Sequence, residues 1–393
     1  MSLENEMSFG WVDFSDDGSV SDYFKDKKPV EPRDPLKISA ITRYFAGRFY
    51  PEIKTQLTRA KYYVAVPYAL LELEEKVKDH PEKYASEKEI KELLVEIEKR
   101  QRDWLCKNSP DESFPGCQNK GKSFNYPSED YWSSLKSLGI LDPKVKDYSL
   151  NDCLKNLPKI INTTEKRWDD LVSDLYEQYK QNGPDKLKIT LTEEEKQYVS
   201  GRFKEKSADS PFAKILEKAK ASEKDRKEIT EKLKSDKKDK FLIVKDIYSE
   251  IGGNDSYIID FRVATVFSEF VYVLKIIYEE RILKSKADAK KRWENLKLDR
   301  LIYLAKNLDL DVVKLSDDKI DDAKQFLSKA KELVINNKAD KDKIFDKLDK
   351  LICNRLSIDI KHNISDSDKW KGQEKPDFYS GTAVRILLDL IDG

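Results

Sequence analysis

The sequence predicts a mainly α-helical protein made of several bundle-like helical domains, with few short strands and an N-terminal clip. Apolar residues recur at three- and four-residue spacings along most of the chain, as in helices that bury one face. Charged residues make up 38% and hydrophobic residues 39% of the 393 positions, which predicts real cores surrounded by charged helical faces. Beyond the N-terminus, strand signals are limited to KLKITL (186–191) and FLIV (241–244).

The chain begins with a predicted clip and tether, residues 1–35. The short segment GWVDFS (10–15) is aromatic and β-branched, which favours a strand or clip that buries Trp11 and Phe14 against the body. Asp13 between them has no visible partner for catalysis. The polar, proline-rich stretch 16–35 predicts an extended tether.

Residues 36–159 predict an N-terminal helical domain. Ile38, Ile41, Phe45 and Phe49 define one buried face of a first helix, which Pro51 ends. A second helix follows over 54–79, with a kink expected at an internal proline. A third begins at a capping box formed by Ser86 and Glu89.

A compact helix at residues 128–141 forms a helix-turn-helix-like segment within this domain. Ser128 is a suitable N-cap for EDYWSSLKSL, and Gly139 is a suitable C-terminal stop. Such helices occur in DNA-reading modules and in ordinary bundles, so the motif does not separate these two interpretations.

The remainder divides into a charge-rich helical spacer, 160–240, and a C-terminal helical domain, 241–393. Balanced charges at four-residue offsets indicate a solvated, ion-paired surface in the spacer. The segment 258–283 is the most hydrophobic helix and is expected to be a core helix. The chain closes on an apolar helical face that must pack on the body: Val384, Leu387, Leu388 and Ile391.

Four segments taken together resemble a prokaryotic family of proteins, domain-of-unknown-function family 6361. They are MSFGWVDFS, ITRYFAGRFYPEIKTQLTRAKYYVAVPYALLELE, DYWSSLKSLGI and the closing DF…VRILLDLIDG. The resemblance runs from Met7 to Gly393 and is weakest in the charged middle. It implies no activity and no catalytic residues. It does imply partners of helicase and nuclease type in genome-defence neighbourhoods.

The segment from Arg43 to Tyr63 is the predicted contact surface. It carries five basic residues against one acidic residue, with tyrosines between them, in a chain whose 74 basic and 74 acidic residues balance. Arginine and lysine suit phosphates, and neighbouring aromatic rings stack on bases. The candidate binding residues for nucleic acid or a partner are Arg43, Arg48, Arg59, Lys61, Tyr62 and Tyr63. Alternatively, Arg59 and Arg43 pair with acids elsewhere in the fold while the tyrosines fill the core.

Two further features lie in the C-terminal domain. The stretch 284–300 holds seven basic and three acidic residues, and we expect an exposed helix face anchored by Trp293. Arg262, Glu269 and Tyr272 share one stripe of the preceding helix at seven- and three-residue offsets. We interpret that stripe as a buried, mutually satisfied pair.

The sequence offers little for catalysis. It has no phosphate-binding GxxxxGK[ST] loop, no GxGxxG after a strand and no GxSxG elbow. Four scattered cysteines and two distant histidines disfavour a zinc site, a disulfide framework and a nucleophile pair. We therefore expect no cofactor and no metal. No membrane-spanning run or signal peptide is visible, so we expect a cytoplasmic protein.

The favoured function is a non-catalytic, DNA-associated accessory or scaffold protein, a subunit of an anti-phage defence system with helicase or nuclease partners. Two alternatives stay open. One is a metal-dependent nuclease, or another enzyme, with an unrecognised carboxylate site, because carboxylates are abundant. The other is a pure protein–protein adaptor, because tyrosine and arginine are also common at interfaces.

The docking of the N-terminal clip can be tested by replacing Trp11 with alanine. Truncating a buried aromatic side chain should lower the free energy of unfolding by a few kcal/mol, roughly 3–5. The measurement is the denaturation midpoint of both proteins by circular dichroism. An unchanged midpoint for Trp11→Ala would show that the clip does not dock.

Overall fold

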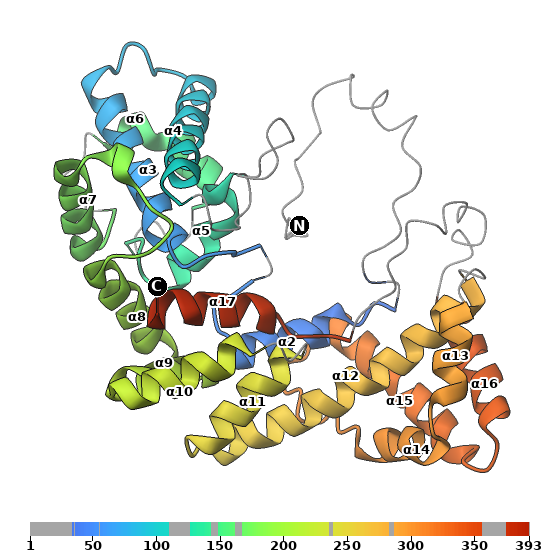
Figure 1. The fold of residues 1–393 in the computed structure, drawn as a ribbon. Helices are drawn as coiled ribbons and strands as arrows, with labels where there is room; N and C mark the ends of the chain where they lie inside the picture. The colour runs from blue at the N-terminus through green and yellow to red at the C-terminus, as the bar shows by residue number, and fades with distance from the viewer. Residues whose placement is uncertain are drawn as a thin grey trace. The chain divides into compact units, whose positions relative to one another are not determined.

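The chain folds as a mainly α-helical protein, which confirms the predicted fold class (Figure 1). The computed structural model describes residues 34, 36–54, 56–109, 126–142, 148–161, 167–235, 239–282, 287–355 and 375–392. These residues form sixteen α-helices and one short 3-10 helix, with a single β-bridge between Leu141 and Trp168 as their only strand-type pairing. The predicted clip at 10–15, and the tether apart from Asp34, lie outside the described residues.

Two compact units make up the fold, and each combines segments that are distant in sequence. Unit 1 contains the described residues of 49–253 and 379–392, and unit 2 contains those of 34–48 and 254–378. The boundary predicted near residue 240 is therefore wrong, because the observed boundary between the units falls after Gly253. The predicted sequence-continuous domains 36–159 and 241–393 are also split between the two units.

Unit 1 consists of ten α-helices and the 3-10 helix in its described part. They are α3 (Tyr62–Asp79), α4 (Glu87–Asn108), α5 (Pro127–Ser137), α6 (Leu150–Ile160), α7 (Asp170–Asn182), η2 (Pro184–Lys186), α8 (Glu193–Ser207), α9 (Pro211–Ala221), α10 (Glu223–Lys234), α11 (Lys240–Glu250) and α17 (Ser380–Ile391). The central element is α3, which packs on α4, α5, α6, α7 and α8. Its first nine residues are all buried, so it has no solvent face there.

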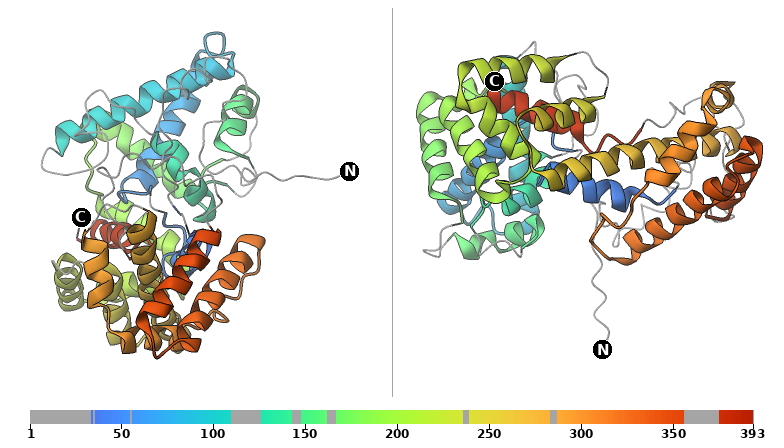
Figure 2. Two further views of the ribbon diagram at one scale, coloured as in Figure 1. Left: turned by 90° about the vertical axis from the view of Figure 1, so that its right-hand side faces the viewer. Right: turned by 90° about the horizontal axis from the view of Figure 1, so that it is seen from below.

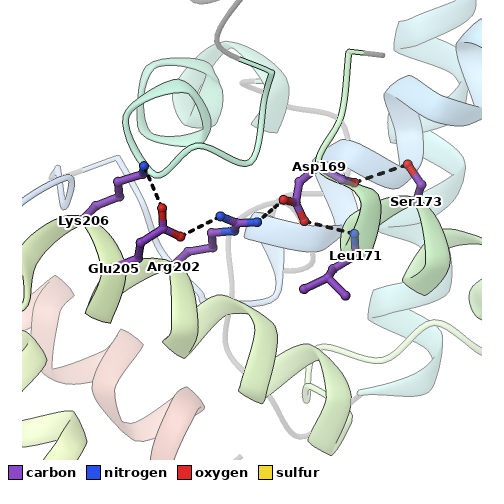
Figure 3. A network of polar contacts seen from close by, with 6 residues as sticks. All are labelled: Asp169, Leu171, Ser173, Arg202, Glu205 and Lys206. Atoms are coloured by element: carbon purple, nitrogen blue, oxygen red, sulfur yellow. Dashed lines mark hydrogen bonds and ion pairs between the residues drawn. The ribbon is translucent and has the colours of Figure 1, made fainter.

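The charged middle of the chain is an integral part of unit 1 and not a spacer. Val199, Phe203 and Phe212 of α8 and α9 are fully buried in its core. The outer faces carry the expected short-range ion pairs between residues three or four positions apart. Figure 3 shows a longer connection, in which Arg202 of α8 lies between Asp169, the N-cap of α7, and Glu205.

Both predicted strands are absent from the described structure of these segments. Residues 187–192 form irregular backbone after η2, and FLIV lies inside α11. The side chain of Asp239 accepts a hydrogen bond from the amide of Leu242 and so caps that helix. A short apolar run does not distinguish a strand from a buried helix, and the cap supports the helix.

The C-terminal helix α17 docks in unit 1, as its apolar face predicts. It packs on α8, α9, α10 and α11, although it follows them by more than a hundred residues (Figure 1, Figure 2). Val384, Leu387 and Ile391 are buried and Leu388 is half-buried. The terminal helix is thus part of the core of this unit.

Unit 2 is organised around the long helix α12. Its described helices are α2 (Ser39–Phe49, up to Arg48), α12 (Asp255–Ile282), α13 (Ala287–Asn295), α14 (Leu298–Asn307), α15 (Asp318–Asn336) and α16 (Lys341–Arg355). α12 packs on α13, α14 and α16, and Figure 2 shows α13–α16 grouped around it. The rings of Phe45, Phe267 and Phe378 meet at centroid distances of 5.7–6.1 Å and bring α2 to this core. In the described residues of both units, no helix combines the length and apolarity that a bilayer crossing requires.

The start of α5 is stabilised by a carboxyl group from another helix. α5 begins at Pro127 and not after Ser128, and its N-cap, Tyr126, supplies no side-chain bond. Instead, the amide of Ser128 donates to Glu98 Oε1 of α4 at 2.8 Å. Glu98 is 3% exposed, and burial raises the pKa of its carboxyl to about 8.

Replacing Glu98 with glutamine should change how stability depends on pH. Between the ordinary pKa of 4.5 and about 8, the folded protein keeps a proton that the unfolded chain releases. The free energy of unfolding therefore falls as the pH rises through this range. In Glu98→Gln this pH dependence should be flatter. At pH 9 the free energy of unfolding of the variant should be higher than that of the wild type by about 1 kcal/mol or more.

Urea denaturation at pH 5, 7 and 9 measures this difference. The matched control is Glu96→Gln on the same helix, whose side chain is 70% exposed. Its pH profile should run parallel to that of the wild type. Parallel profiles for Glu98→Gln as well would contradict the assignment.

Candidate nucleic-acid interface

The six predicted site residues are divided between the two units. Arg43 and Arg48 belong to α2 in unit 2, whereas Arg59, Lys61, Tyr62 and Tyr63 belong to unit 1. The net charge of the segment does not reveal this division, because a local count of basic residues contains no information on tertiary structure or burial.

Arg59 is an internal residue of unit 1. The residue is only 6% exposed. Its Nε donates to both carboxylate oxygens of Asp389 on α17 at 3.0 Å, and its Nη2 lies 2.9 Å from Asp389 Oδ1. Asp389 also accepts the amide of Ala60 at 2.8 Å. A buried, multiply bonded ion pair of this kind leaves no surface for a phosphate.

Lys61 is buried beside a second carboxylate. Its Nζ donates to both oxygens of Glu195 on α8, at 2.8 and 2.6 Å, and Tyr68 of α3 donates to Oε1 at 3.0 Å. Glu195 also forms a capping box with Thr192. Burial lowers the pKa of the Lys61 ammonium against the opposing effect of Glu195. The cluster fixes the start of α3 to the start of α8.

Tyr62 and Tyr63 belong to the core. Tyr62 is 5% and Tyr63 0% exposed, and both rings contact Tyr131 of α5 at 5.5 and 5.2 Å. Tyr63 also meets Phe203 edge to face at 5.4 Å. These are packing contacts between aromatic side chains, and neither ring presents a face on which a base could stack.

Arg48 keeps part of its side chain at the surface of unit 2. It donates from Nε and Nη2 to Asp260 Oδ2 of α12 at 3.0 and 2.8 Å, and its guanidinium lies 4.5 Å from the centre of the Tyr257 ring. Its side chain is 38% exposed. Arg43 is half-buried. The alternative that the sequence left open therefore describes Arg59, Tyr62 and Tyr63 correctly, and the expected single surface over 43–63 does not form.

The helix-turn-helix-like segment presents no basic recognition face. Tyr131, Trp132 and Leu135 of α5 are buried in unit 1. The exposed side includes Glu129 and the half-buried Asp130, whose pKa burial and Glu129 raise to about 6. Acidic groups at this end repel phosphates, so the structure does not favour DNA reading by α5.

The structure brings cations and tyrosines together elsewhere in unit 2, on α12, α13 and α14 and at Lys375; Arg300, Tyr303 and Lys375 are exposed, whereas Tyr272 and Arg292 are half-buried. We call the set Tyr272, Arg292, Arg300, Tyr303 and Lys375 the cationic tyrosine patch. Arg300 Nε donates to Glu269 of α12 at 3.1 Å, and its guanidinium lies 5.0 Å from the centre of the Tyr303 ring. Glu269 lies one turn before Tyr272 on the same face of α12, so its partner Arg300 lies beside the same stretch of that helix.

The other half of the patch surrounds Tyr272. Arg292 Nη1 donates to the Tyr272 hydroxyl at 3.3 Å, and the buried carboxylate of Glu279 pairs with Nη2. Lys375 Nζ lies 5.8 Å from the centre of the same ring. Tyr303 is 48% exposed and the Arg300 side chain 46%. Cations and ring faces thus lie together at the surface of one unit.

The sequence signals for the patch were present but separate. Arg292 and Arg300 lie in the basic stretch 284–300, and Tyr272 lies in the α12 stripe. Trp293 anchors α13 as expected, with a ring contact to Phe345 at 5.0 Å. The interpretation of the stripe as an internal pair is wrong, because Arg262 is exposed and Glu269 pairs with Arg300 of α14. Tyr303 carried no signal in the sequence.

Candidate metal ligands and reactive thiols were also compared with the described structure. Among them, no group of three or more His, Cys, Asp or Glu is arranged to hold a metal ion. Cys153 borders a small apolar pocket of about 30 Å³, the volume of a water molecule or two, and burial raises its thiol pKa to about 11. Cys153 and Cys353 are free thiols, whereas Cys106 is disulfide-bonded.

Comparisons with known proteins add no assignment: no protein-family model, no curated protein and no solved structure matches this chain. The resemblance to family 6361 thus stays an expectation from the sequence.

The internal role of Arg59 predicts a specific pattern of stability. Arg59→Met and Asp389→Asn should each lower the free energy of unfolding by about 3 kcal/mol, because each leaves an unpaired buried charge. The double variant removes both charges and keeps an acceptor for the amide of Ala60, so it should be more stable than either single variant.

Denaturation of the four proteins monitored by circular dichroism measures this cycle. The matched control is Arg226→Met, which removes an exposed pair with Glu223 and should cost less than about 1 kcal/mol. Single variants as stable as the control would show that the buried pair does not hold α17.

Proposed function

We propose that this chain is a non-catalytic accessory or scaffold protein that associates with DNA, and that unit 2 makes the contact. The observation that carries the proposal is the cationic tyrosine patch. It combines guanidinium and ammonium groups with the half-buried ring of Tyr272 and the exposed ring of Tyr303, and cations beside aromatic rings are the combination that nucleic-acid surfaces use.

The charge around the patch supports the same conclusion. From Lys290 to Lys306 the chain carries six basic and two acidic residues, although the whole protein is neutral. Lys290, Lys291, Lys297 and Lys306 are exposed. A local excess of positive charge attracts phosphates even when the net charge of a protein is zero.

The proposed partners and cellular location rest on the resemblance to family 6361. We propose helicase- or nuclease-type partners in prokaryotic anti-phage defence, and a cytoplasmic location where such partners meet DNA. In this assignment the many helical faces with ion-paired charges serve as scaffold, and the catalytic chemistry belongs to the partners.

DNA association predicts a salt-dependent interaction that depends on the patch. A titration of labelled DNA, duplex and single-stranded, should show binding at low salt that weakens steeply as salt rises. The double variant Arg300→Gln/Lys375→Gln should weaken binding at least about tenfold, because two phosphate contacts are lost. The measurement is fluorescence anisotropy.

The matched control is the double variant Lys88→Gln/Lys204→Gln, which removes two exposed lysines of unit 1 and should bind like the wild type. Equal binding by both double variants would assign DNA contact to another surface. Absence of binding at low salt would overturn the DNA contact. Cleavage of the DNA with Mg²⁺ or Mn²⁺, lost with a chelator, would overturn the non-catalytic assignment.

A further inference from the structure

We infer that the cationic tyrosine patch binds unpaired nucleic acid in preference to duplex, with Tyr303 as the ring on which a base stacks. This inference rests on the proposed function and specifies its ligand. It follows from which side chains of the patch are exposed and from what duplex DNA offers to them.

Tyr303 is exposed at the surface of unit 2. The ring lies on the outer side of α14, whereas Leu301, Leu304 and Ala305 of the same helix are buried. Nearly half of the tyrosine side chain is accessible, and the guanidinium of Arg300, one turn earlier, lies 5.0 Å from the ring centre. An arginine beside a tyrosine forms a combined platform for a base and its phosphate.

A duplex exposes only part of each base to a protein surface. In a double helix the faces of the bases are covered by their neighbours, and only base edges and the backbone are accessible. An exposed ring therefore gains stacking energy from unpaired bases alone. A duplex could use only the cations of the patch.

The packing of α13 and α14 also favours a single strand over a duplex. Entry into a major groove requires a helix that projects from the body with polar side chains at its tip. α13 and α14 both pack along α12, with Ala289 and Leu301 fully buried (Figure 1). They form a surface over which a flexible strand can lie.

The positions of the cations define a path for the strand. Arg300 lies beside Tyr303, Lys375 lies beside Tyr272, and exposed Arg262 lies on the α12 stripe two turns before Glu269. Arg292 is held against Tyr272 by the buried carboxylate of Glu279. Three exposed cations predict a slope of about −2 for the logarithm of affinity against the logarithm of salt concentration on a single strand.

The experiment compares a fluorescein-labelled oligothymidylate 15-mer with a 15-base-pair duplex, using the full chain and fluorescence anisotropy. The wild type should bind the single strand about tenfold more tightly than the duplex. Tyr303→Leu should weaken single-strand binding at least about fivefold and leave duplex binding unchanged. Tyr303→Phe, which keeps the ring, should retain the wild-type affinity.

The matched control is Tyr148→Leu, which removes a tyrosine of unit 1 that is 44% exposed and should leave both affinities unchanged. Circular dichroism confirms that each variant is folded. Equal affinity for both ligands, or no effect of Tyr303→Leu, would overturn this inference and leave the proposed function in place. Binding to neither ligand would instead overturn the proposed function.

Discussion

Two buried ion pairs at the start of α3 fix the architecture of unit 1. Arg59 pairs with Asp389 of α17, and Lys61 pairs with Glu195 of α8. A charge taken out of water requires a close partner, so these two helices must lie beside the same three-residue stretch. The C-terminal helix and the charged middle of the chain are thereby held against the first helical element of the unit. The tyrosines that follow, Tyr62 and Tyr63, are then enclosed as core residues.

The same constraint decides which cations are available for binding. Breaking a buried pair costs about 3–5 kcal/mol, whereas an exposed pair contributes about 0–1 kcal/mol. Arg59 and Lys61 are therefore committed to the fold. Arg300 pairs with Glu269 at a half-exposed position, and it can exchange that carboxylate for a phosphate at little cost. This difference in free energy, more than the number of basic residues, distinguishes a cation committed to the fold from one that can take a new partner.

Counting charges along the sequence could not make that distinction. The segments 43–63 and 284–300 carry the same local excess of positive charge. In the first segment tyrosines lie close to the basic residues in sequence, yet Tyr62 and Tyr63 face the core. In the second, the relevant rings come from α12 and α14, and only packing of these helices places them beside Arg292 and Arg300.

The sequence by itself determined what depends on short-range interactions: the helical class, the capping box at Ser86 and Glu89, and the apolar face of the C-terminal helix. Tertiary structure decided the two units, the helical state of FLIV and the exposure of each cation. The physical reason is the range of the interactions involved. A cap or a helical face is written within a few residues, whereas the partner of Arg59 is 330 positions away and becomes visible only when the chain is folded.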